Sequence, residues 1–588
     1  MGELRQLVTI DYIVIAGYFF LVFLVGILLT KKASKSIDNF FVGGRNMSWW
    51  LIGISMAATN FSIDTPIAIT KYVAKEGIGG VWFFWASAIS ALLVTFLFAR
   101  LWRRSGVITD AEIIESRYGG LSASALRLFK GCYFGIIFNV FIMGWVFVAL
   151  RKVIASVIPN ANYCEYYVWI ATAIVFVYTI ASGFYGVVLT DFIQYFIAFF
   201  GSIVLAIYAL NDVGGVSGLI EKLPQATGRT DTLNFVPSLA ENSSLPLSLF
   251  LTYLLVQWWA HKYADGGGKH IQRMLSAKDE NHSVYASLFF SFINYALQVW
   301  PWILTALCAL VVFKDIPNFD PEQGYPMMMM RVLPAGMLGL VLVCLIGAFM
   351  STIDTHLNLG ASYIINDIYK RFYRKDASDS HYVLMSRITM FFLLIISVII
   401  SMNINSVGDA WKFLLTFASG AGLTWIVRWF WWRANAWTEF SGMITSGIVA
   451  TTLKLCHSKT SFLPQQAIYA ENLLITVSIT TIVWVLVTYM TAPVDEEILV
   501  KFVKKVRPGS IGWNYIYKKY NITPEPFLSN ALASWVLSLI SFLGINFGVG
   551  SLLLGLKLQG IILILVGMVF FYLILVRLRK ERQTNLNY

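Results

Sequence analysis

Apolar stretches long enough to cross a lipid bilayer recur about fifteen times along this 588-residue chain, since a spanning helix needs about 20 mostly apolar residues. Inside a bilayer, only helices and closed barrels satisfy every backbone polar group. Charged residues make up only 13% of the chain, against roughly 25% in soluble proteins. The sequence therefore predicts an all-α polytopic membrane protein, with spans near residues 10–30, 47–73, 79–102, 127–157, 163–182, 185–211, 245–263, 283–313, 335–369, 382–403, 408–431, 438–455, 471–492, 527–548 and 556–577.

Lysine and arginine are concentrated in alternate loops between these stretches. One such loop follows the seventh stretch and carries Lys262, Lys269, Arg273 and Lys278. Because basic residues accumulate on the cytoplasmic side of membrane proteins, we expect the N-terminus outside and the tail from Arg577 inside. The net charge of +12 thus indicates orientation in a cell membrane rather than nucleic-acid binding.

The ninth stretch carries polar residues at its centre, where a carboxylate costs about 2.5–3.5 kcal/mol on insertion scales. Ser351, Asp354 and Thr355 share one helix face, because they are spaced i, i+3 and i+4. Such an oxygen-rich face suits a hard cation. The alternative is that Ser and Thr only pack against neighbouring helices.

The second stretch contains Pro66, which removes a backbone donor and clashes with the preceding turn. Four polar residues lie just before or beside it: Asn60, Ser62, Asp64 and Thr65. Carbonyls freed at a broken helix can bind a cation. An ordinary proline kink is the alternative.

Two further stretches carry polar or aromatic candidates. Asp191 lies in the sixth stretch, where it could cap a helix or bind an ion. The seventh stretch contains Gln257, Trp258 and Trp259. The paired tryptophans could anchor the helix at the interface or form a stacking wall for a ligand.

Four segments resemble motifs of the sodium:solute symporter family, which includes the sodium/glucose cotransporters. In chain order they are Asp38–Arg45 (DNFFVGGR), Leu189–Gln194 (LTDFIQ), Ile271–Lys278 (IQRMLSAK), and Ser351-Thr352 with Asn366–Lys370 (NDIYK). Their order and spacing agree with the family from about residue 38 to 435, and the last four spans lie outside the resemblance.

This resemblance implies a leucine-transporter-like fold of two five-helix inverted repeats, residues 47–211 and 245–431. Residues 1–46 would form an additional N-terminal span and loop, and 212–244 an external loop. Residues 432–588 would add about four helices, with a cytoplasmic loop at 493–526 and the tail. Substrate and ion would bind at the repeat interface, near the bilayer midplane.

By position, the resemblance implies a shared sodium site formed by the carbonyls of Ala58, Phe61 and Ala348 and the hydroxyls of Ser351 and Thr352. Sodium ion is therefore the expected coupling ion. Some family members have a second cation site, which would map here to Asp191, Asp354 and Thr355. The family carries an uncharged residue at the position of Asp354. Two nearby carboxylates could hold a second sodium or share a proton.

The expected activity is symport of sodium with a small organic solute, without catalysis and without an obligate protein partner or nucleic acid. Thr65 and Phe84 stand where sugar transporters have Gln and Glu, which argues against a typical hexose. The candidate solute ligands are Asn60, Ser62, Asp64, Thr65, Ser87, Gln257, Trp258 and Trp259, and Asp64 could favour an amine.

Four alternatives to sodium symport are considered on the sequence. An intramembrane enzyme would need a motif such as H-E-x-x-H or G-x-S-x-G, and the chain contains neither. A membrane sensor fused to a kinase would need a soluble domain after the last span, and none is evident. A channel, or a transporter that couples solute to protons or to mixed cations, has the same sequence pattern.

Overall fold

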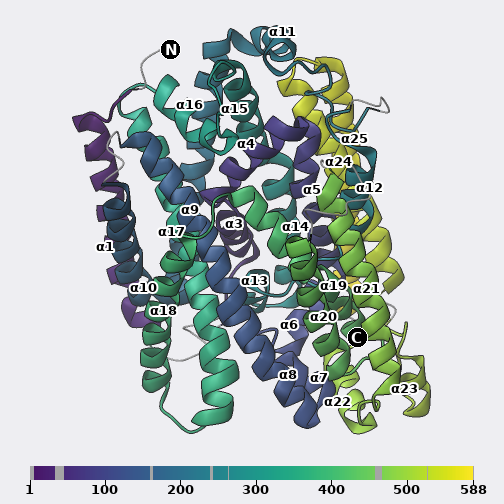
Figure 1. The fold of residues 1–588 in the computed structure, drawn as a ribbon. Helices are drawn as coiled ribbons and strands as arrows, with labels where there is room; N and C mark the ends of the chain where they lie inside the picture. The colour runs from purple at the N-terminus through teal and green to yellow at the C-terminus, as the bar shows by residue number, and fades with distance from the viewer. Residues whose placement is uncertain are drawn as a thin grey trace.

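The computed structural model describes residues 5–33, 45–158, 163–238, 243–262, 264–456, 467–525 and 528–586. Every element in these ranges is a helix (Figure 1), and all the predicted spans fall on helices, which confirms the all-α prediction. Within the described ranges, ten helices are long and apolar enough to cross a membrane on their own. Two of the other predicted spans are divided by breaks, which shortens their individual helices.

The first set of helices precedes the connection between Thr227 and Leu247. Their bounds are α1 Thr9–Ala33, α3 Trp49–Asn60, α4 Asp64–Glu76, η2 Ile78–Val81, α5 Trp82–Leu93, η3 Val94–Phe98, α6 Ala99–Ser105, α7 Ile113–Tyr118, α8 Gly120–Cys132, η4 Tyr133–Phe138, α9 Asn139–Val157, α10 Cys164–Val213 and α11 Gly215–Thr227. Of the motif at 38–45, only Arg45 lies within the described residues, and its guanidinium donates to the Gly106 carbonyl at 3.0 Å.

The second half continues from the external connection to the end of the last motif. Its helices are α12 Leu247–Thr252, η6 Tyr253–Gln257, α13 Lys269–Ser276, α14 Glu280–Phe292, η7 Ile293–Leu297, α15 Val299–Val312, η8 Pro321–Gln323, α16 Gly324–Val332, α17 Met337–Ser362, η9 Tyr363–Tyr373, α18 Asp379–Ser401 and α19 Val407–Phe430.

The helix α10 covers two predicted spans without an intervening loop. Tyr178 and Thr190 nevertheless share a hydrogen bond between their hydroxyls. In a straight helix these residues would lie about 18 Å apart along the axis. The axis must therefore turn back between them, so that 164–180 and 188–213 act as two packed segments.

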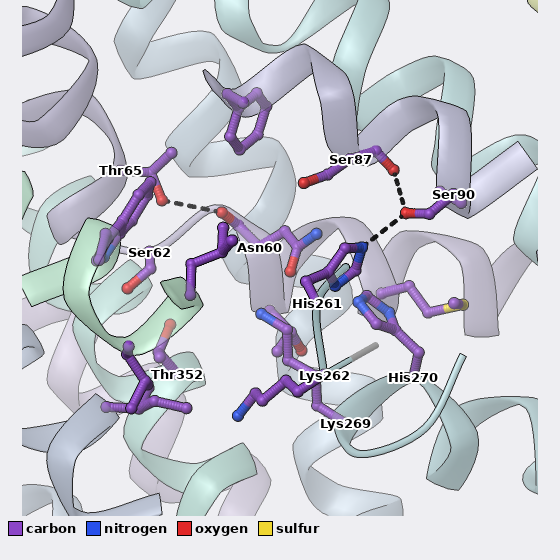
Figure 2. Close-up of a pocket in the computed structure, with 18 of the residues that line it drawn as sticks. Asn60, Ser62, Thr65, Ser87, Ser90, His261, Lys262, Lys269, His270 and Thr352 are labelled. Atoms are coloured by element: carbon purple, nitrogen blue, oxygen red, sulfur yellow. Dashed lines mark hydrogen bonds between the residues drawn. The ribbon is translucent and has the colours of Figure 1, made fainter. Parts of the chain in front are cut away.

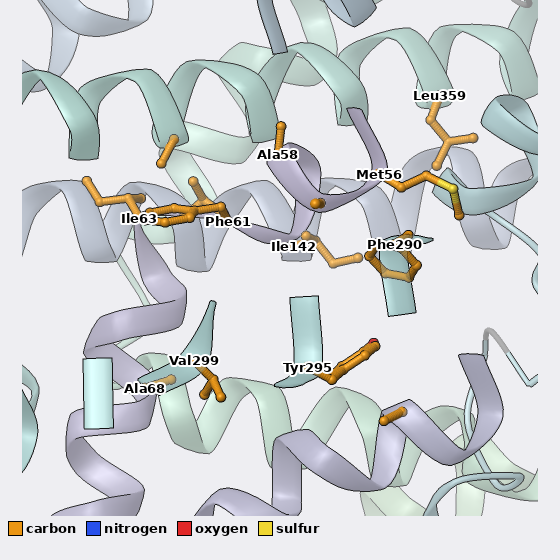
Figure 3. Close-up of a cluster of buried hydrophobic side chains, with 14 of the residues drawn as sticks. Met56, Ala58, Phe61, Ile63, Ala68, Ile142, Phe290, Tyr295, Val299 and Leu359 are labelled. Carbon is orange, nitrogen blue, oxygen red and sulfur yellow. The ribbon is translucent and has the colours of Figure 1, made fainter. Parts of the chain in front are cut away.

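Two helices are interrupted in the middle of the fold. The first interruption separates α3 from α4 at residues 61–63, as Pro66 predicts. Phe61 adopts φ −77° and ψ 77° there, and its ring packs edge-on against Trp302 at 4.8 Å. Figure 3 shows the break among buried apolar side chains that include Ile142 of α9 and Val299 of α15.

The second interruption corrects the prediction for the seventh span. Helical structure stops at Gln257 and resumes at Lys269, and residues 258–262 and 264–268 between them are irregular. Gly266 (φ 84°) and Gly268 (φ 66°) adopt conformations that favour glycine. Lys269 faces a cavity and Arg273 is 1% exposed, so neither belongs to the cytoplasmic loop to which charge counting assigned them.

The last third of the chain packs around this core. Its helices are α20 Ala436–Cys456, α21 Ile468–Met490, α22 Glu496–Val506, α23 Asn514–Lys519, α24 Leu528–Leu553 and α25 Lys557–Leu586. Glycines allow α24 and α25 to pack closely, since a Cβ on Gly548 would lie 2.9 Å from the Gly560 carbonyl oxygen. The predicted loop at 493–526 contains α22 and α23. An ion pair of 2.7 Å between Glu496 of α22 and Lys519 of α23 connects them. Hydrogen bonds from Lys519, Tyr520 and Tyr515 lower the pKa of Glu496 to about 2.

Candidate functional site

The break between α3 and α4 exposes helix-end carbonyls to the middle of the fold. Helix termini leave their last carbonyls without partners in the same helix. At this end, the Phe61 amide donates to the Ala57 carbonyl at 2.8 Å, and the Thr65 hydroxyl donates to the Asn60 carbonyl at 3.1 Å. These bonds leave the carbonyl of Ala58, one of the predicted sodium ligands, at a helix end where a cation could bind it.

The predicted hydroxyl ligands lie on α17 beside this break. The Thr352 hydroxyl is buried and has no hydrogen-bond partner among the described residues. It lines the same cavity as Ser62, and both are labelled on the left of the view in Figure 2. The Ser351 hydroxyl instead donates to Asp191 at 2.5 Å. The fifth predicted ligand, Ala348, is buried one turn before them.

Asp191 forms a buried ion pair that sequence reasoning missed. Its carboxylate contacts the Arg273 guanidinium at 3.1 Å and accepts a hydrogen bond from Ser55 at 2.5 Å. Arg273 also donates to the hydroxyls of Thr355, at 2.9 Å, and of Thr59. Two of the three residues predicted for a second cation, Asp191 and Thr355, are therefore bridged by a guanidinium. Only the family motif around Arg273 could have indicated this role, because its position in the chain suggested a cytoplasmic loop.

Asp354 lies on the same helix as Thr355 but has different partners. It is 1% exposed and accepts a hydrogen bond from Thr179 of α10. No ion pair of Asp354 occurs among the described residues, whereas Arg273 balances the charge of Asp191. The two carboxylates are therefore in unlike surroundings, and only Asp354 is without a cationic partner in the described part of the chain.

A cavity of about 230 Å³ lies between the two helix breaks. Five of the predicted solute ligands line it: Asn60, Ser62, Asp64, Thr65 and Ser87. The Asp64 carboxylate accepts a hydrogen bond from the Trp411 indole at 3.0 Å. Wide π-helical turns in three neighbouring helices place Val94, Phe138 and Tyr295 on the wall. Such turns are frequent at functional sites.

The other three predicted ligands lie away from the cavity. The Gln257 side chain donates to the Phe83 carbonyl at 2.7 Å and accepts from Tyr469 at 2.9 Å, which fixes it as a connector between helices. Trp258 packs against Trp535, and the Trp259 indole donates to the Leu255 carbonyl. The helix ends at Gln257, and the chain after it turns these side chains out of the cavity.

The residues of this second break and of the first turn of α13 were not predicted as ligands, although they form one side of the cavity. They are His261, Lys262, Gly266, Lys269 and His270. Three contacts fix the break: the Asp265 carboxylate pairs with Arg428 and accepts from the Trp429 indole, and the Asp265 carbonyl accepts from the Trp102 indole at 2.6 Å. The run of three glycines was the sequence signal that could have revealed it.

Known proteins resemble both the sequence and the fold of this chain. The sodium:solute symporter family matches residues 40–446. Sodium/glucose cotransporter 2 of Rattus norvegicus is 26% identical over 444 residues, which are 68% of this chain and 64% of that protein. The sodium/glucose cotransporter of Vibrio parahaemolyticus is 24% identical over 516 residues, 83% of this chain and 92% of that protein.

A solved structure has the same fold. It is a Na⁺-coupled sialic acid symporter in a substrate-bound outward-open state, with a TM-score of 0.67 and 20% identity, covering 83% of this chain and 99% of that chain. This likeness confirms the predicted leucine-transporter-like fold. The family and the fold are those of sodium-coupled transporters. The family match across well over half of the sequence shows that this chain belongs to the sodium:solute symporter family.

Proposed function

We propose that this protein couples inward sodium flux to the uptake of a small organic solute by alternating access. The observation that carries the proposal is the cavity between two helix breaks, with the unpartnered Thr352 hydroxyl on its wall. Asn60, Ser62, Asp64, Thr65 and Ser87 would contact the solute. Ala58, Phe61, Ala348, Ser351 and Thr352 would bind sodium, whose preferred ligands are oxygens.

Buried ion networks lie on either side of this cavity along the helices. One joins Glu322 of η8 to Lys152 of α9 at 2.8 Å and to Lys71 of α4 at 3.4 Å. The other joins Arg127 of α8 to Asp367 of η9 at 2.8 Å. We propose that these networks form and break in turn as the cavity opens to each side. Separating the partners of such a buried pair costs free energy. An intact network therefore favours the conformation in which its side of the cavity is closed.

Uptake into proteoliposomes tests the proposed function. Radiolabelled sugars, amino acids and organic acids would be offered with an inward sodium gradient, with the same sodium concentration on both sides, and with potassium in place of sodium. We expect at least one solute to accumulate only under the gradient. Equal uptake in all three conditions would exclude symport, and a sodium current without any accumulated solute would indicate a channel.

For Asp354, we propose a second sodium ion as the occupant, with a proton as the alternative. The motivation is that the Thr179 hydroxyl donates to one carboxylate oxygen and that no cation among the described residues pairs with Asp354. Asp354→Ser should weaken the second site and lower the steepness of the sodium dependence, while the pH dependence stays as in the wild type. A flattened pH dependence with unchanged sodium dependence would show a proton instead. A variant identical to wild type in both would leave Asp354 a structural role only.

We propose that the protein is a multi-pass protein of the cell membrane. The basic loops then predict that the tail from Arg577 lies in the cytoplasm. A cysteine introduced at Tyr588, with Cys132, Cys164 and Cys456 replaced by serine, should resist an impermeant thiol reagent on intact cells. The matched control is a cysteine at the exposed Thr230, between α11 and α12, which should react. Reaction at position 588 would overturn this orientation.

A further inference from the structure

We infer that the solute is a small organic anion, with a single carboxylate or similar acidic group held by Lys262 and Lys269 and an apolar body against the aromatic side of the cavity. This inference rests on the proposed function, because it names the substrate class of that same cavity. It starts from the composition of the cavity wall, in which the charged side chains are Lys262, Lys269 and Asp64.

Lys262 lies in the second helix break, and Lys269 is the first residue of α13. Both lie on the lower side of the cavity in Figure 2, with His261 above them. The third charged group, Asp64, lies at the start of α4. The wall therefore carries two ammonium groups and one carboxylate, which gives it a net positive charge. A monoanion would bring this wall to neutrality.

Three fully buried cations of the described chain have a carboxylate at close range, whereas a fourth, Arg117, donates to backbone carbonyls instead. Arg273 pairs with Asp191 at 3.1 Å, Lys130 with Glu439 at 3.0 Å, and Arg428 with Asp265. Lys269 is half-buried on the cavity wall, and no carboxylate lies within ion-pair distance of it in the described part of the chain. The nearest acidic wall residue, Asp64, instead holds the Trp411 indole at 3.0 Å. A buried charge is costly unless it is paired, and a bound anion supplies the missing partner.

Lys262 has an additional aromatic contact. Its ammonium lies over the ring of Phe138, 5.0 Å from the centroid. This contact holds the side chain on the cavity wall, and an anion approaching Lys269 would come within the field of both ammonium groups. Lysine acts toward an acidic group as a compact point charge with three donors, so the pair can accept carboxylates of different shapes.

The rest of the wall suits an apolar body rather than a polyol. Aromatic and aliphatic side chains dominate it, among them Phe83, Phe84, Phe138, Ile142, Trp145, Phe290, Tyr295, Trp411 and Leu414. Several of the hydroxyls are already engaged. Ser90 bonds the Ser87 carbonyl and His261, each at 3.0 Å, and Thr65 bonds Asn60. A sugar would leave many of its own hydroxyls without partners in such a cavity, and buried unpartnered hydroxyls are costly.

Charge balance also links this substrate to coupling. A membrane potential that is negative inside drives positive charge inward. One sodium with one monoanion moves no net charge, whereas two sodium ions with one monoanion move a single positive charge. The membrane potential would therefore drive uptake of the anion only through the second cation site.

Matched acid and amide pairs test the inference on the full-length protein in nanodiscs. The probes are benzoate with benzamide, 2-methylpropanoate with 2-methylpropanamide, and glucose, each measured by thermal stabilisation in sodium and in potassium. Binding to the folded state raises the unfolding temperature. We expect at least one acid to stabilise the protein in sodium, and its amide to bind at least 10-fold more weakly. The inference would be overturned if an amide or glucose stabilised the protein as much as the acids do. It would also be overturned if neither acid stabilised the protein.

Variants then locate the anion site. Lys269→Met should weaken binding of the acid at least 10-fold and remove the preference over its amide, whereas Lys269→Arg should retain the preference. Lys278→Met is the matched control, because Lys278 is exposed, lies just after the helix that Lys269 begins, and does not line the cavity. Unchanged acid binding by Lys269→Met would overturn the assignment. Stabilisation by sodium alone, measured for each variant, shows that the variant is folded.

The outcomes separate the two proposals. Sodium-driven uptake of a neutral solute, equal to or better than that of the acids, would contradict the anion while leaving symport intact. Acid binding that is indifferent to sodium, with uptake indifferent to the sodium gradient, would contradict symport while leaving the anion site intact. Stabilisation by chloride or nitrate as strong as by the organic acids would show that the apolar body contributes nothing, and would also overturn the inference.

Discussion

Arg273→Gln is expected to abolish transport and to lower the free energy of unfolding by about 3–5 kcal/mol, the range for removing one partner of a buried ion pair. Asp191 and Arg273 are 0% and 1% exposed, and their contact is 3.1 Å. Without the guanidinium, Asp191 keeps a buried negative charge, and the hydroxyls of Thr59 and Thr355 lose a donor. Chemical unfolding of the purified protein measures the loss.

A second substitution distinguishes charge from packing. Asp191→Asn in the Arg273→Gln background removes the stranded charge, so the double variant should recover most of the lost stability. Arg507→Gln is the control, since Arg507 pairs with Glu525 at 2.9 Å at the surface, where such a pair contributes about 0–1 kcal/mol. An Arg273→Gln protein as stable as wild type would contradict a structural role for the pair.

Thr352→Ala is expected to raise the sodium concentration for half-maximal transport at least 10-fold, which corresponds to about 1.4 kcal/mol of lost binding. The Thr352 hydroxyl has no protein partner in the described structure, so its removal costs the fold little and takes an oxygen ligand from sodium. The maximal rate at saturating sodium should stay close to that of the wild type. Transport against sodium concentration in proteoliposomes measures both quantities.

Conservative and neighbouring variants sharpen this test. Thr352→Ser keeps the hydroxyl and should keep the sodium affinity. Ser351→Ala should reduce both affinity and stability, because that hydroxyl also donates to Asp191 at 2.5 Å. Thr305→Ala removes a buried hydroxyl that bonds only its own helix in the described structure, and should leave the sodium dependence unchanged. Unchanged sodium dependence in the Ser351→Ala and Thr352→Ala double variant would exclude this sodium site.

Local chemistry made much of the fold predictable from the sequence. Apolar length indicates a span because the bilayer leaves the backbone few alternatives, and the helices confirm those stretches. Pro66 predicts the first break because a proline cannot donate the helical hydrogen bond. The spacing of Ser351, Asp354 and Thr355 places them on one face by helical geometry alone. The family motifs indicated the leucine-transporter-like fold, which the solved structure confirms.

Tertiary structure decided how these elements face one another. The second break has no proline, and charge counting cannot tell a lysine in a cytoplasmic loop from one inside the fold, so Lys269 and Arg273 were misplaced. Helical periodicity gives the face of a residue but not the partner on another helix. Arg273 and Asp191 are 82 positions apart and meet only because α13 and α10 pack around α3. The charge of the cavity wall follows from that packing, since it is the sum of side chains from helices distant in the sequence.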